Sequence, residues 1–113
     1  MDEITIKKIA KSYISKSNDI DYEGMAALFS LDAEWIPISP MQPRRGRAEI
    51  KDAYLQHVKK NNRPIINDRY FADGNTCLVE FEVVLEDNST IGIIDVFTFN
   101  ERGEIVKLKV YKN

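Results

Sequence analysis

The chain has 113 residues, 43% of them apolar and 30% charged, and a formal net charge of −2 at pH 7. This length predicts one compact domain, residues 1–113, that buries about two thirds of its unfolded surface, and the intermixed charges exclude nucleic acid and membrane as expected partners. Because Cys77 is the single cysteine and no secretory signal opens the chain, we expect no internal disulfide and a location in the cytoplasm.

Two helices are predicted at the start of the chain. The first follows a possible N-terminal cap at Asp2, ends near Asn18 and places Tyr13 on its apolar stripe. The second is short and runs from a cap at Asp21 through Phe29, with apolar residues at helical spacing.

The next part of the chain contains a predicted irregular segment and a third helix. Residues 33–36 form a brief extended stretch, and the three prolines within residues 37–46 make the following segment irregular. Residues 47–61 are predicted to be helical, and the helix buries Ile50, Ala53, Tyr54, His57 and Val58.

The second half of the chain is predicted to form four strands separated by polar turns. The strands cover residues 64–72, 75–86, 89–100 and 104–112. In the last strand Val106, Leu108 and Val110 face one way, and the opposite face is mixed in polarity, which suits a dimer contact. Helices followed by strands predict an α+β fold.

Asp95 lies inside the most apolar of these strands. It shares a face with Ile93, Phe97 and Phe99, so its carboxyl is expected to face the core or a cavity, where desolvation favours the protonated acid. A protonated acid can donate a hydrogen bond. The alternatives are that Asp95 lies at a strand end or pairs with a buried hydroxyl group.

Five segments of the sequence carry a resemblance to a known family. They are KSY at 11–13, GMAALFSLDA at 24–33, RRGRAEI at 44–50, IDVFTFN at 94–100 and GEIV at 103–106. With the order of elements, they resemble the SnoaL-like or nuclear-transport-factor-2-like superfamily, most closely bacterial ketosteroid isomerase. The resemblance implies a cone-shaped α+β fold with three N-terminal helices packed on a strongly curved, mostly antiparallel sheet, and a homodimer formed through the outer sheet face.

The resemblance also implies a binding site for an oxyanion. In the isomerases a tyrosine on the first helix and a protonated aspartic acid on the sheet donate to the substrate oxygen, and a further tyrosine stands behind the first. Matching positions assigns these roles to Tyr13, Asp95 and Tyr54. Two neutral donors in an apolar pocket stabilise charge on a carbonyl oxygen better than water does.

The general base of the isomerases has no counterpart here. Pro37 occupies that position and cannot transfer a proton, so steroid isomerisation is not expected. Glu34 should point to the opposite face, and Asp32 belongs to a turn. His57 follows Tyr54 by one helical turn and is a candidate catalytic residue, although it also suits a partly exposed helix position.

The remaining predicted site residues are apolar and would contact a ligand. They are Trp35, Pro37, Val79, Phe81, Phe97 and Leu108. Trp35 is also compatible with a purely structural place in the core. The cluster formed by Arg44, Arg45 and Arg47 could hold an anion or simply be solvated.

The sequence therefore predicts a domain that binds a small apolar molecule with a carbonyl or phenolic oxygen. The alternative is an isomerase- or cyclase-like lyase that stabilises an enolate and uses a different base. With one histidine and no glycine-rich phosphate loop, no metal and no nucleotide cofactor are expected.

Overall fold

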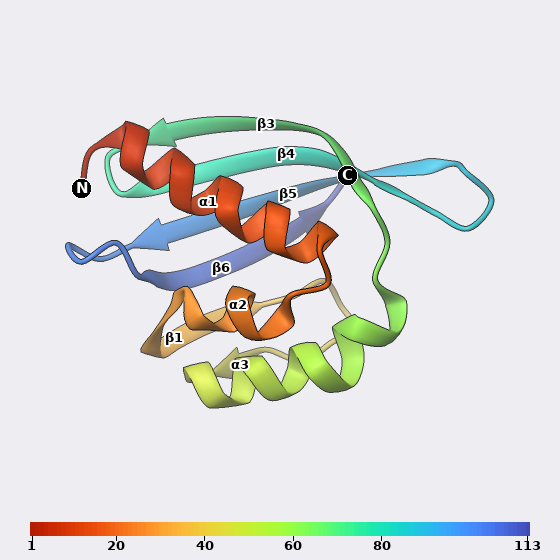
Figure 1. Cartoon of the computed structure of the whole chain (residues 1–113), viewed down its shortest axis with the longest axis horizontal. Helices are drawn as coiled ribbons and strands as arrows, with labels where there is room; N and C mark the ends of the chain where they lie inside the picture. The colour runs from red at the N-terminus through yellow and green to blue at the C-terminus, as the bar shows by residue number, and fades with distance from the viewer.

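In the computed structural model, which describes residues 1–113, helices from the first half of the chain pack on one face of a curved six-stranded sheet. Figure 1 shows α1 crossing in front of the long strands, while α2 and α3 lie near β1. The predicted α+β fold is confirmed. No helix has both the length and the apolar character needed to span a bilayer.

The helices begin where the sequence offers caps. The Asp2 carboxylate accepts the backbone N–H of Thr5 at 2.7 Å at the start of α1 (Glu3–Asn18). The Asp21 carboxylate accepts from Gly24 at 2.9 Å at the start of α2 (Tyr22–Ala27). These contacts satisfy N–H groups that have no partner inside the helix.

The third predicted helix is continuous but changes its winding. It comprises α3 (Arg47–Ala53), a π-helical turn (Tyr54–Val58) and a 3-10 turn (Lys59–Asn61). In the π-helical turn the Lys59 N–H donates to the carbonyl of Tyr54, five residues earlier. The wider turn changes which side chains share a face after Tyr54.

The prediction for residues 22–36 was wrong at the junction of helix and strand. The second helix ends at Ala27, and β1 (Phe29–Ile36) begins at Phe29. Phe29 pairs in parallel register with Ile105 and is fully buried, so sheet pairing outweighs the helical spacing of its side chain. A two-residue strand, β2 (Arg44–Arg45), also interrupts the segment that was predicted to be irregular.

The four predicted strands are present, with ends that differ by no more than two residues. They are β3 (Ile65–Asp73), β4 (Thr76–Val84), β5 (Thr90–Phe99) and β6 (Ile105–Lys112). The sheet order is β2-β1-β6-β5-β4-β3, and only the β1–β6 pair is parallel. The C-terminal strand therefore lies at the centre of the sheet.

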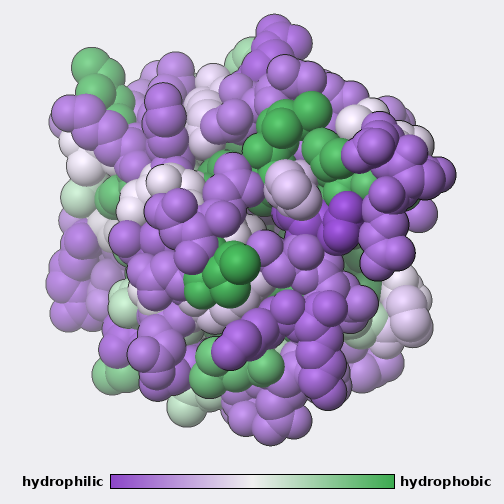
Figure 2. All heavy atoms as spheres, turned by 45° about the vertical axis from the view of Figure 1, so that its right-hand side comes forward, coloured by the Kyte–Doolittle hydropathy of each residue, from purple (hydrophilic) through white to green (hydrophobic).

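The face of the sheet towards the helices forms the core. On β5 the residues Ile93, Asp95, Phe97 and Phe99 are all buried, as their alternation predicted. The prediction for Val106 was wrong: a register shift opposite Thr98 and Phe99 lets Ile105 take the buried position. A bulge of this kind breaks simple alternation. Figure 2 shows a mostly hydrophilic surface on which hydrophobic residues form small separate groups.

Candidate functional site

A cavity of about 210 Å³ lies between the helices and the sheet. Thirteen residues line it, and they come from α1, α2, the loop after β1, the π-helical turn and five strands of the sheet, β1 and β3 to β6. Its polar lining residues are Tyr13, Ser17, Tyr54 and Asp95. An apolar chamber with a few convergent polar groups is the usual form of a small-molecule site.

Tyr13 and Tyr54 form a hydrogen-bonded pair at this cavity. Their hydroxyl oxygens lie 2.6 Å apart, and their rings meet edge to face with centroids 6.4 Å apart. Burial raises the pKa of Tyr13 well above its ordinary value, and burial likewise raises the pKa of Tyr54. Both hydroxyls therefore stay protonated and can act as neutral donors.

Asp95 faces the same cavity from the middle of β5. Its sheet partners are Val79 on β4 and Val110 on β6, so it does not lie at a strand end. It is 4% exposed, and desolvation raises its pKa to about 8, with no hydrogen bond contributing to the shift. The carboxyl is therefore neutral at pH 7 and has no partner hydroxyl within the chain.

Asp95 is the only carboxyl in the cavity lining. Pro37 lines the cavity, as the sequence predicted, and brings no acid or base. Glu34 lies 3.9 Å from Arg45 in an ion pair, and the carboxylate of Asp32 accepts from the Ser30 hydroxyl at 3.2 Å. Neither of these acids reaches the cavity, so the chamber contains no second carboxyl that could accept a proton.

The structure does not bring His57 to the cavity. The prediction assumed α-helical spacing after Tyr54, but this turn is π-helical and contains more residues per turn. Val58 consequently takes the position that lines the cavity, and His57 is exposed and lines a different pocket.

The apolar residues predicted to contact a ligand divide into two groups. Trp35 and Phe81 line the cavity together with Pro37. Val79, Phe97 and Leu108 do not line it, because they are completely covered in the core. Phe97, for example, packs edge to face against Tyr13 with their ring centroids 5.1 Å apart. This contact leaves no space for a ligand beside Phe97.

Other lining residues were not identified from the sequence. They are Ser17, Met25, Ile38, Met41, Val58, Ile65 and Val110. Ser17 had a usable signal, since it follows Tyr13 by four residues on the same helical stripe. Ile38 and Met41 had none, because they belong to an irregular loop whose path is set by tertiary packing.

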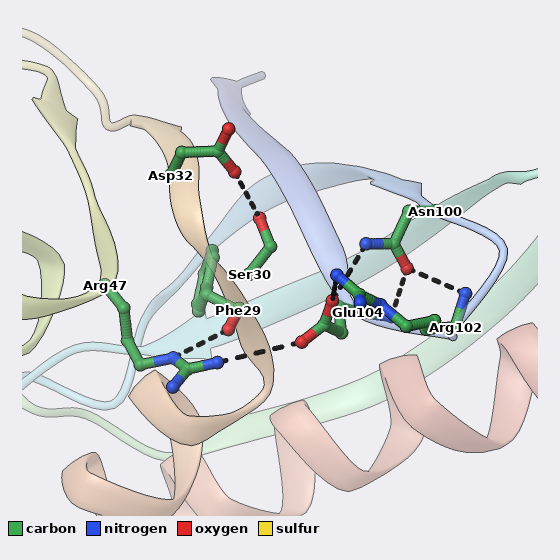
Figure 3. Close-up of polar contacts among 7 residues, drawn as sticks. All are labelled: Phe29, Ser30, Asp32, Arg47, Asn100, Arg102 and Glu104. Atoms are coloured by element: carbon green, nitrogen blue, oxygen red, sulfur yellow. Dashed lines mark hydrogen bonds and ion pairs between the residues drawn. The ribbon is translucent and has the colours of Figure 1, made fainter.

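The arginine cluster of the sequence is dispersed in space. Arg47 donates from Nε to the carbonyl of Phe29 at 2.8 Å and lies 3.8 Å from the Glu104 carboxylate (Figure 3). Glu104 also pairs with Arg102 at 3.2 Å and accepts from the Asn100 side chain at 2.9 Å. These contacts join the start of α3 to β1 and to the β5–β6 turn, so Arg47 has a structural role.

Comparison with known proteins identifies both the family and the fold. The sequence matches the family model of the SnoaL-like domain over residues 10–108. Similar solved structures include an NTF-2 like protein of unknown function from Burkholderia xenovorans LB400, with 15% identity, a TM-score of 0.83 and coverage of 98% of this chain and 84% of that one.

Two further structures are named for activities. The epoxide hydrolase/cyclase-like enzyme SalBIII, which has a role in pyran ring formation in the polyether salinomycin, is 24% identical, with a TM-score of 0.79 over 99% of this chain and 93% of that one. A candidate ketosteroid isomerase from Kribbella flavida DSM 17836 is 17% identical, with a TM-score of 0.82 over 96% and 78%. Identities this low show a shared fold and leave the activity to be argued from the site.

Proposed function

Because this chain belongs to the SnoaL-like domain family, we propose that it binds a small, mostly apolar molecule whose carbonyl or phenolic oxygen is held by Tyr13 and Asp95. The observation that carries the proposal is the buried carboxyl of Asp95, which has no hydrogen-bond partner in the chain and faces the cavity. A ligand oxygen would supply the missing partner.

Tyr54 has a supporting role in this proposal. Either hydroxyl can donate across the 2.6 Å contact, and when a ligand oxygen accepts the Tyr13 proton, Tyr54 becomes the donor to Tyr13. Successive hydrogen bonds polarise one another, so the pair is a stronger donor than an isolated tyrosine. With the protonated carboxyl of Asp95, the ligand oxygen receives two hydrogen bonds in a chamber of low polarity.

The same geometry argues against isomerisation of a steroid. Moving hydrogen between two substrate carbons needs a group that first accepts and then returns a proton. Pro37 replaces that group, and no second carboxyl lines the cavity. The site as proposed stabilises an oxyanion but does not complete the proton transfer.

Calorimetric titration with 4-propylphenol tests the proposal. Tyr13→Phe and Asp95→Ala should each weaken binding about tenfold or more, because each removes a hydrogen bond in an apolar site. Tyr111→Phe, which changes an exposed tyrosine, is the matched control and should bind as the parent does. Unchanged affinity in both cavity variants would show that the oxygen is not held there.

An isomerase- or cyclase-like lyase is the second candidate function. In its favour, the pKa of Asp95 at about 8 would let this residue itself exchange a proton near neutral pH, and one similar structure is a cyclase-like enzyme. Turnover of a β,γ-unsaturated ketone by the parent would support catalysis. Turnover only in Pro37→Asp would show that the donors are competent and that the base is missing.

We also propose that two copies associate through the outer sheet face. Phe71, Leu78 and Val96 form a continuous apolar row across β3, β4 and β5, and Phe71 is 48% exposed. Covering such a row is favourable at about 25 cal/mol per Å² of apolar surface. Val96→Glu should convert the dimer into a monomer in light scattering after size exclusion. A monomeric parent would refute this contact.

A further inference from the structure

A second pocket lies beside the cavity. It has a volume of about 280 Å³ and is lined by Pro40, Met41, Gln42, Arg44 and His57. Met41 also lines the cavity, so the two spaces share this residue as a wall. Because Met41 is 37% exposed and its side chain is unbranched and flexible, it can move aside for a ligand that occupies both spaces.

The sheet register directs Arg44 to the side of the cavity. Arg44 is the antiparallel partner of Trp35, a residue that lines the cavity. Side chains of paired residues project from the same face of a sheet. The next residue, Arg45, pairs with Glu34 on the opposite face and forms an ion pair with it at 3.9 Å.

Arg44 carries a charge that the chain does not neutralise. Its Nη1 donates to the carbonyl oxygens of Gln42 at 2.7 Å and Pro43 at 3.3 Å, and it takes part in no ion pair within the chain. The two backbone contacts fix the guanidinium and leave its other nitrogens free. No acidic side chain lines this pocket.

His57 contributes a second donor to this pocket. Its imidazole makes no hydrogen bond within the chain, and only its backbone carbonyl is used, by Asn61 at 3.4 Å. An arginine and an imidazole at one pocket, with no acid between them, provide the donors that a carboxylate recognises.

The size of the inner cavity limits the apolar part of the ligand. A protein cavity of about 150 Å³ accommodates benzene. The cavity here, about 210 Å³, therefore accommodates one ring of the ligand with a few further atoms.

We infer that the ligand is a single-ring phenol or enone with a short side chain that ends in a carboxylate. The ring occupies the cavity with its oxygen at Tyr13 and Asp95, and the carboxylate passes Met41 to reach Arg44 and His57. This inference rests on the proposed function, since it extends the same site outwards.

Two nearly isosteric probes test whether the second pocket binds a carboxylate: 3-(4-hydroxyphenyl)propanoate and its neutral analogue 4-propylphenol. Affinities are measured by calorimetry with the parent, Arg44→Gln, His57→Gln and the matched control Arg45→Gln. The parent should bind the acid more tightly than the analogue. Arg44→Gln should weaken binding of the acid about tenfold, as expected for the loss of one charge-assisted hydrogen bond, and should leave binding of the analogue unchanged.

The remaining variants complete the test. His57→Gln should weaken the acid by a smaller factor, and Arg45→Gln should bind both probes as the parent does. Unchanged binding of 4-propylphenol in Arg44→Gln shows that this variant is folded. If Arg44→Gln and Arg45→Gln lose affinity for the acid equally, the effect reflects general surface charge and the inference is overturned.

Failure of this inference is distinguishable from failure of the proposed function. If 4-propylphenol binds and depends on Tyr13 and Asp95, but Arg44→Gln does not weaken the acid, only the carboxylate subsite is wrong. If the affinity for 4-propylphenol is the same in Tyr13→Phe and Asp95→Ala as in the parent, the oxygen site itself is wrong.

Discussion

The burial of Asp95 predicts an unusual dependence of stability on pH. Its pKa is about 8 in the folded protein and about 4 in an unfolded chain. Between these values the folded state binds one more proton than the unfolded state. The free energy of unfolding therefore falls as pH rises through this window, and the loss is complete above the folded pKa.

The expected magnitude follows from the size of the shift. Each pH unit within the window costs about 1.4 kcal/mol, so from about pH 5 to about pH 8 the carboxyl removes up to about 4 kcal/mol of stability. Asp95→Asn preserves the shape of the side chain and cannot ionise. Between about pH 5 and about pH 8, the free energy of unfolding of this variant should fall by about 4 kcal/mol less than that of the parent. At about pH 8 the variant should therefore be the more stable protein.

Urea denaturation provides the measurement. Trp35 is the only tryptophan and is buried, so its fluorescence reports unfolding. Asp87→Asn is the control, because it removes an exposed carboxylate in the β4–β5 turn. Its free energy of unfolding should fall with pH over this range as that of the parent does. Parallel pH profiles for the parent and Asp95→Asn would mean that the carboxyl is hydrated and ionised in the folded state, and the reasoning would be refuted.

Three other predictions concern the site and its support. Binding of cyclohex-2-enone, which does not titrate, should weaken as pH rises through about 8 and become independent of pH in Asp95→Asn; a flat calorimetric profile in the parent would contradict the donor role. Tyr54→Phe should weaken 4-propylphenol binding about three- to tenfold, less than Tyr13→Phe, because the contact of Tyr54 with the ligand is indirect. Arg47→Met should lower the free energy of unfolding by about 1–2 kcal/mol in urea, whereas Arg102→Met, whose side chain is 81% exposed, should change it by less than about 0.5 kcal/mol; equal effects would contradict the role of the Arg47 contact with Phe29.

Much of the fold followed from local patterns in the sequence. Caps at Asp2 and Asp21 marked the starts of two helices, and alternation with turn residues located four strands. The inward direction of Asp95 also followed, since side chains in a strand alternate between two faces. These features depend only on neighbouring residues, which a sequence displays directly.

The limits of sequence reasoning appear where one element meets another. Phe29 has the spacing of a helix residue, yet pairing with Ile105 places it in a strand. The π-helical turn moves His57 out of the cavity, and the bulge in β6 places Ile105 instead of Val106 at the buried position. Each outcome depends on contacts with distant segments, which override local preference.

The composition of the site was decided in the same way. The sequence by itself determined that Tyr13, Tyr54 and Asp95 point inwards, because the phase of a side chain is fixed within its own helix or strand. Only the tertiary structure decided which inward residues border empty space and which are covered, such as Phe97 beneath Tyr13. The tertiary structure also placed Arg44, and not Arg45 or Arg47, at the pocket that contains His57. The space beside a residue depends on how whole elements pack together.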